Sequence, residues 1–168
     1  MIFIVLNIIV SVVIFIIDRA VLHNLSIVGY VNLILVALVF WQVFGGLRSS
    51  LLAFVVCGWL LDIFTFKALG INTLALCLVF GAVYFLLLNF VTNRSLYSFL
   101  LLIAVATVIF DVVISGLAGA DRLIAWSFWL AEGKRLAANA VLTAVFFYLF
   151  NFLSRRIQPV FLRDVKKY

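Results

Sequence analysis

The sequence has few of the residues on which soluble enzymes and metalloproteins rely. Its 168 residues include one histidine, one proline and two cysteines, and only 11% of them are charged. Cys57 and Cys77 lie inside apolar runs, where a thiol packs like any other small side chain, so we assign them no chemistry. The single histidine, His23, has no cluster of cysteines, histidines or carboxylates around it. We therefore expect neither a metal ion nor another cofactor.

Low-complexity stretches and internal repeats are also lacking, so residues 1–168 are predicted to form one domain. Hydrophobic residues make up 68% of the chain, and the mean hydropathy is +1.38. A net charge of +6 does not indicate nucleic acid binding, because the basic residues before the C-terminal tail are scattered between apolar runs. The composition instead predicts an all-α integral membrane protein in which little of the chain lies outside the bilayer.

Charged residues divide the chain into six apolar segments, and a spanning helix needs roughly 20 such residues. Between the last two segments, residues 120–133 are too short and too charged to cross the bilayer. We expect Asp121 to begin and Gly133 to end a short interfacial helix with Trp126 and Trp129 at headgroup depth; the alternative is an irregular loop. The predicted spans are approximately residues 2–17, 27–47, 49–66, 71–92, 96–118 and 136–154.

The basic residues predict the orientation in the membrane. The tail after the last predicted span holds five of them, which favours a cytoplasmic C-terminus, and six spans then place the N-terminus in the cytoplasm too. Arg122, Lys134 and Arg135 count against this topology, because it places them on the outer side. The five basic residues of the tail are Arg155, Arg156, Arg163, Lys166 and Lys167.

Two aspartates, Asp62 and Asp111, lie within predicted spans, where an ionised side chain at the bilayer centre costs about 2.5–3.5 kcal/mol. Structural pairing or a position near the interface explains both. The alternative is a catalytic dyad, as in aspartyl membrane peptidases such as lipoprotein signal peptidases. The surrounding segments, Gly-Trp-Leu-Leu-Asp-Ile-Phe and Val-Ile-Phe-Asp-Val-Val, lack the Asn-rich signatures of that family. With no nucleophile–base set and no phosphate loop in the sequence, we expect no enzymatic activity.

The most informative stretch of the sequence contains a glycine and an aspartate four residues apart. Gly58 and Asp62 therefore share one helix face. Gly70 then supplies a turn or a close approach, and Asn72 and Thr73 open the next span as polar N-terminal residues. The pattern predicts a tight helix–loop–helix hairpin, in which amides or hydroxyls of the loop satisfy the Asp62 carboxylate.

This hairpin resembles a known family. The pattern Gly58-x-x-x-Asp62, a short loop with Gly70, and then Asn72-x-Leu74 is similar to that of the bacterial rod shape-determining protein MreD. The chain length, the six predicted spans and the basic tail are similar as well.

The MreD resemblance is concentrated in residues 51–88 and implies a fold and a function. The implied fold is similar to that of the substrate-binding subunits of energy-coupling-factor transporters. The implied function is a non-enzymatic component of the cell-elongation complex, which maintains cell shape in the bacterial cytoplasmic (inner) membrane. Its implied partners are an MreC-like protein and, through it, MreB filaments and peptidoglycan synthases.

The same fold similarity supplies an alternative function, a vitamin-type transporter subunit. That function needs a polar-lined pocket, and the sequence shows no cluster of polar side chains for one, so we do not expect a small-molecule substrate. The expected partners are membrane lipid and other membrane proteins of the complex, not nucleic acid. Helices associate in lipid through small residues with an isolated polar group nearby. The candidate interface residues of this kind are Ser115, Gly116, Gly119, Asn139, Ala140, Thr143 and Ala144.

Overall fold

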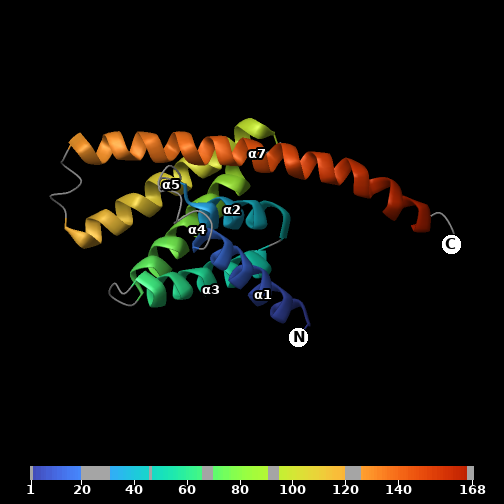
Figure 1. Ribbon diagram of the computed structural model, residues 1–168, viewed down its shortest axis with the longest axis horizontal. Coiled ribbons are helices and arrows are strands. Elements are labelled where there is room, and N and C mark those ends of the chain that lie inside the picture. Colours follow the sequence, from blue (N-terminus) through green and yellow to red (C-terminus); the bar gives the residue numbers. More distant parts are fainter. Residues whose placement is uncertain are drawn as a thin grey trace.

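The computed structural model describes residues 2–19, 31–45, 47–65, 70–90, 95–119 and 126–165, and every regular element in these ranges is helical (Figure 1). Four helices contain segments long and apolar enough to cross a membrane, so the chain is a helical membrane protein. Helices α1 and α2 are also apolar but are shorter, so the presence of six spans stays a prediction. The helices are α1 (Ile2–Ile17), α2 (Leu33–Gly45), α3 (Leu47–Thr65), α4 (Ile71–Asn89), α5 (Leu96–Ala118) and α7 (Trp126–Val165).

Helix α2 is short and forms the centre of the bundle. Its 13 residues rise about 20 Å, less than the roughly 30 Å of a bilayer core. The predicted span, residues 27–47, is longer, but residues 27–30 lie outside the described part of the chain. Val36 and Val39 are fully buried, because α1, α3, α4, α5 and α7 all contact α2. A helix that is apolar on every side is stable in such a place.

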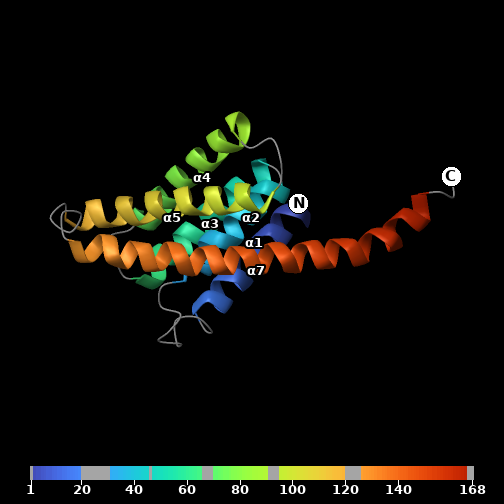
Figure 2. The same cartoon turned by 90° about the horizontal axis from the view of Figure 1, so that it is seen from above.

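Helices that follow one another in the sequence pack side by side around α2. The most extensive contacts join α3 with α4, α4 with α5 and α5 with α7. Figures 1 and 2 show α5 beside the N-terminal part of α7. Aromatic rings fill the space between α2, α5 and α7. Phe40 stacks on Phe99 with 4.5 Å between the ring centroids, and Phe146 lies 5.9 Å from Phe40.

Helix α7 corrects one prediction. It runs without a break from Trp126 to Val165, so the predicted end of a short interfacial helix at Gly133 is wrong. A glycine inside a helix costs only about 1 kcal/mol relative to alanine, and packing of α7 against α5 outweighs that cost. The predicted cap, Asp121, lies outside the described residues. The C-terminal part of α7 extends beyond the other helices (Figure 1).

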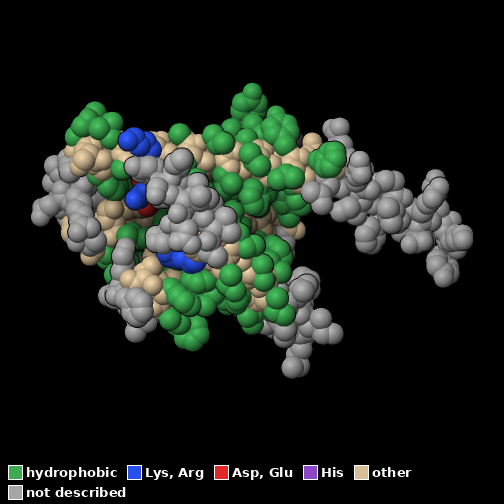
Figure 3. Space-filling view, viewed as in Figure 1, with side chains coloured by type: hydrophobic (Ala, Val, Ile, Leu, Met, Phe, Trp, Pro, Cys, Tyr) green, Lys and Arg blue, Asp and Glu red, His purple; other side chains and the backbone are tan. Residues whose placement is uncertain are grey.

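The surface of the bundle is mainly hydrophobic, as expected for contact with lipid. In the view of Figure 3, the visible atoms of lysine, arginine, aspartate and glutamate gather toward the end of the bundle that lies away from the projecting part of α7. Large apolar side chains such as Trp59, Leu88 and Val141 are exposed elsewhere. The end of the bundle where the charged side chains gather is therefore the candidate location of a functional site.

Candidate functional site

Asp62 caps the neighbouring helix α4. Its carboxylate accepts the backbone N–H groups of Asn72 at 2.8 Å and Thr73 at 3.1 Å, together with the Asn72 amide at 3.0 Å and the Thr73 hydroxyl at 2.5 Å. An N-cap side chain normally satisfies such first-turn N–H groups. The N-cap position of α4 is Gly70, which makes no side-chain cap. Asp62 therefore supplies the cap from α3, with its charge at the positive end of the α4 dipole.

The glycines of the hairpin have two different roles. Gly70 has a φ of 97°, a left-handed conformation that favours glycine. A Cβ on Gly58 would lie 2.7 Å from the Cα of Thr73, so α3 and α4 touch through their backbones at that point. The structure thus brings Gly58, Asp62, Gly70 and Asn72 together. Among the described residues, the donors to Asp62 come from the first turn of α4.

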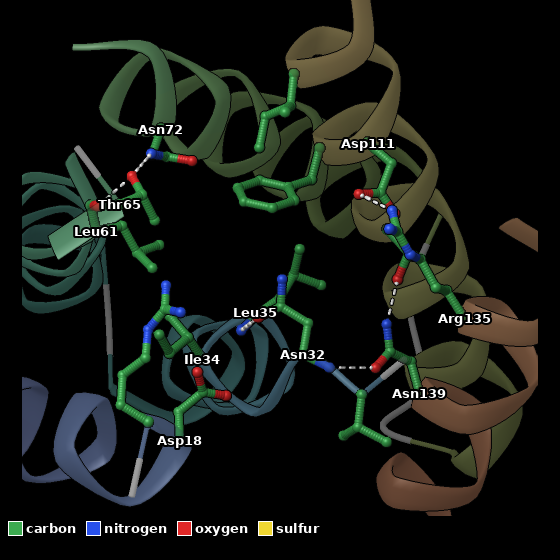
Figure 4. A pocket seen from close by; sticks show the side chains of 15 residues that line it. Asp18, Asn32, Ile34, Leu35, Leu61, Thr65, Asn72, Asp111, Arg135 and Asn139 are labelled. Atoms are coloured by element: carbon green, nitrogen blue, oxygen red, sulfur yellow. Dashed lines mark hydrogen bonds and ion pairs between the residues drawn. The ribbon is translucent and has the colours of Figure 1, made fainter. Parts of the chain in front are cut away.

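A polar cavity of approximately 270 Å³ lies beside this hairpin, at the end of the bundle where α1 and α3 end and α2 and α4 begin. Helices α2, α3, α4, α5 and α7 contribute to its wall, together with the residues that directly follow α1. In Figure 4, Thr65 of α3 and Asn72 of α4 lie across the cavity from Arg135 of α7. The polar residues that line it are Asp18, Arg19, Asn32, Thr65, Asn72, Thr107, Asp111, Arg135 and Asn139.

An ion pair forms one wall of the cavity. Arg135 Nη1 lies 2.8 Å from Asp111 Oδ1, which compensates both charges in a low-dielectric environment. Glu132, one turn earlier on α7, is 3% exposed and lies within electrostatic range of both side chains. Neither of its oxygens has a hydrogen-bond partner among the described residues. Asp62 is bonded to α4 instead, so Asp62 and Asp111 do not form a catalytic dyad.

Asn139 connects three helices at the cavity. Its side-chain oxygen accepts the backbone N–H of Asn32 at 2.9 Å, just before α2, and its amide donates to Thr107 of α5 at 3.1 Å. The Thr143 hydroxyl donates to the Asn139 carbonyl at 2.6 Å, and both side chains are buried. The prediction that Asn139 and Thr143 face another protein is therefore wrong, because their polar groups are bonded within this chain.

The remaining candidate interface residues lie nearer to the surface. Ser115 and Gly119 are half-buried and Gly116 is exposed at the end of α5. Ala140 and Ala144 are half-buried on α7, where Ala144 lines a shallow apolar groove on the outer face of the helix. Their contact with a partner stays a prediction.

Arg19 differs from the other charged residues of the cavity. No acidic side chain pairs with it among the described residues, and its Nε atom is buried without a hydrogen-bond partner there. Its guanidinium carbon lies 5.8 Å from the centre of the Phe15 ring. Asp18, the preceding residue, accepts the backbone N–H of Leu33 at 3.1 Å and so caps α2.

Sequence reasoning identified Asp111 and Asn139 but missed the cavity that they share with Arg19 and Thr107. Asp111 and Thr107 lie in one apolar segment, Asn139 lies in another, and Arg19 lies between two such segments, so the residues are far apart along the chain. The signal lay in their positions, because the ends of odd-numbered spans and the starts of even-numbered spans meet at one face of an up-and-down bundle. Polar residues gathered at that face predict a shared polar site.

Together the fold and the site define a polytopic helical membrane protein with a polar cavity at one end and an apolar surface around the bundle. Comparison of the chain with family models, with curated proteins and with solved structures finds no match.

Proposed function

We propose that the chain is a non-enzymatic scaffold of the bacterial cell-elongation complex, similar to MreD, which binds an MreC-like protein in the cytoplasmic membrane. In this proposal both termini are cytoplasmic, and the binding surface lies within the bilayer. The observation that carries the proposal is an apolar groove of approximately 620 Å³ on the side of the bundle.

The groove lies between α1 and α7, which both contact α2 but do not contact each other in the described part of the chain. Ile17, Phe44 and Phe150 at its edges are exposed, so in the membrane lipid or another protein must cover them. Helices associate in lipid by close packing, and aromatic rings provide a large rigid contact area. The aromatic residues that line the groove are Phe40, Trp41, Phe44, Phe146 and Phe150. A transmembrane helix of the partner is the occupant that we propose.

The hairpin with the MreD-like pattern supports the same proposal. Both oxygens of the Asp62 carboxylate accept hydrogen bonds from Asn72 and Thr73, so the aspartate is engaged in holding α3 against α4. A side chain used in this way stabilises a rigid bundle and is not left free for chemistry. This is the role expected of a motif in a scaffold.

A substitution that fills the groove tests the proposal. Ala37 lies on α2 and lines the groove, so Ala37→Leu places extra atoms where the partner helix would pack. Overpacking costs typically 1–3 kcal/mol, and about 1.4 kcal/mol corresponds to a tenfold loss of affinity. We expect recovery of the MreC-like protein by co-purification to fall about tenfold or more.

The matched control is Ala104→Leu, which makes the same change at an exposed position of α5 outside the groove. Leucine inserts into membranes at least as readily as alanine, so both variants should reach the membrane in equal amounts. Equal recovery of the partner by Ala37→Leu and Ala104→Leu would exclude the groove as the interface.

The polar cavity favours a second candidate function, the substrate-binding subunit of a small-molecule transporter. Such a subunit needs buried polar groups within the membrane, and the cavity provides nine polar lining residues. A transporter subunit should co-purify with a coupling membrane protein and its ATPases in place of an MreC-like protein. The same co-purification experiment therefore distinguishes the two candidates.

A further inference from the structure

We propose that the polar cavity binds a small hydrophilic molecule with a carboxylate or phosphate group, and that this oxyanion pairs with Arg19. The proposal goes beyond the scaffold function and does not depend on it. It follows from the charges that line the cavity, from the hydrogen-bonding groups left available there, and from the size of the space.

Of the two described cations that line the cavity, Arg19 is the one without an acidic partner among the described residues. Asp111 is paired with Arg135, and Asp18 accepts the N–H of Leu33 at the start of α2. Arg19 has neither an ion pair nor a hydrogen bond to Nε among the described residues. Arg19 is half-buried, and a charge that is partly removed from water is stabilised by a partner of opposite charge. An oxyanion supplies the opposite charge together with acceptors that match the guanidinium fork.

Two neutral side chains add hydrogen-bonding capacity to the cavity. The Asn72 amide nitrogen donates to Asp62 at 3.0 Å and to Thr65 at 3.1 Å, which fixes the orientation of the amide because a carboxylate only accepts. Its oxygen, which Figure 4 shows on the side away from Thr65, accepts no hydrogen bond from the described residues. Thr107 Oγ1 accepts from Asn139, so its hydroxyl proton is available. The cavity thus offers a cation, an acceptor and a donor.

The size of the cavity limits the ligand class. A volume of approximately 270 Å³ equals the space of about nine waters at roughly 30 Å³ each. A molecule of the size of an amino acid fits, and so does the phosphate headgroup of a lipid, whereas a protein segment does not. These two sources share the oxyanion chemistry, and the experiment below separates them.

The position of the cavity indicates the side from which the ligand enters. The cavity lies where α1 and α3 end and α2 and α4 begin, away from the projecting end of α7 (Figure 1). With the predicted cytoplasmic termini, this end of the bundle faces the outer side of the membrane. The ligand in this proposal is therefore an extracytoplasmic solute or an outer-leaflet headgroup.

Thermal unfolding of the full chain in lipid nanodiscs tests the proposal. One arm uses nanodiscs of an uncharged, phosphate-free glycolipid with millimolar inorganic phosphate, acetate or glutamate, and the other uses the same nanodiscs with added phosphatidylglycerol and no dissolved probe. The four tryptophans report unfolding. Ligand near saturation should raise Tm by about 5–10 °C. Arg19→Gln should abolish the rise, whereas Arg48→Gln, which removes an exposed charge from the start of α3, should keep it.

Each outcome decides the question. A rise with a dissolved anion that depends on Arg19 supports a solute ligand, and a rise only with phosphatidylglycerol supports a headgroup. No rise with any probe, or an equal rise in Arg19→Gln, overturns the proposal. Should Arg19→Gln fail to fold, Arg19→Lys keeps the charge but loses the fork, and we expect about tenfold weaker binding. Unchanged affinity of that variant would then overturn the proposal.

Discussion

Asp62 holds two helices together through four hydrogen bonds, two to each carboxylate oxygen. Asp62→Asn keeps one acceptor oxygen but turns an NH₂ group toward donors of α4, so we expect a loss of about 1–3 kcal/mol in stability. Asp62→Leu removes both acceptors and should cost more. Unfolding in mild detergent measures both variants. If both variants were as stable as the unsubstituted chain, the cap would not matter for folding.

Gly58 permits the closest approach of α3 and α4. A Cβ at this position would lie 2.7 Å from the Thr73 backbone, and overpacking of this kind costs about 1–3 kcal/mol. We therefore expect Gly58→Ala to lower the unfolding temperature. Gly81→Ala is the control within α4, because a Cβ there meets nothing within 4 Å and alanine favours the helix by about 1 kcal/mol. Equal effects of the two substitutions would contradict the close approach.

The sequence predicted the Asp62 hairpin well, because its residues lie close together along the chain. Asp62 and Asn72 are ten residues apart, so helix periodicity and turn chemistry place them. The hydrogen bond between Asn32 and Asn139 joins residues 107 apart, and no local pattern predicts such a contact. Arg19 belongs to the cavity for the same non-local reason.

Among the helices, α7 shows how tertiary packing overrides a local signal. The sequence predicted a break at Gly133, but the helix continues through it. Gly133→Ala distinguishes the two readings. In a continuous helix alanine should raise stability by about 1 kcal/mol, and a Cβ at Gly133 meets nothing within 4 Å. A left-handed glycine at a helix end would instead make alanine destabilising. Thermal unfolding in detergent provides the measurement.

The short helix α2 shows a second limit of sequence reasoning. Its apolar residues predicted a span over residues 27–47, but hydropathy alone does not separate a lipid-exposed helix from one surrounded by protein. The described helix, Leu33–Gly45, contacts every other described helix. Its role as the centre of the bundle became visible only when the other helices were placed around it.

In the whole molecule, charged residues lie at the cavity as well as at the predicted membrane surfaces. Arg135 counted against the predicted topology when it was treated as an interfacial charge. In the structure it pairs with Asp111 at 2.8 Å although 39% of its side chain stays exposed, so the ion pair offers a second reason for its position besides the membrane surface. The basic residues at the C-terminus then dominate the positive-inside signal, and cytoplasmic termini stay the predicted topology.

In the proposed complex, a partner's transmembrane helix occupies the apolar groove between α1 and α7. Replacing Phe150, which lines the groove and is 46% exposed, with the photo-crosslinking residue p-benzoylphenylalanine tests this claim in living cells. Leu74 on α4, 50% exposed, is the control position. We predict a crosslinked adduct with an MreC-like protein from position 150 and not from position 74. Adducts with lipid alone at position 150, or the same protein adduct from both positions, would contradict the claim.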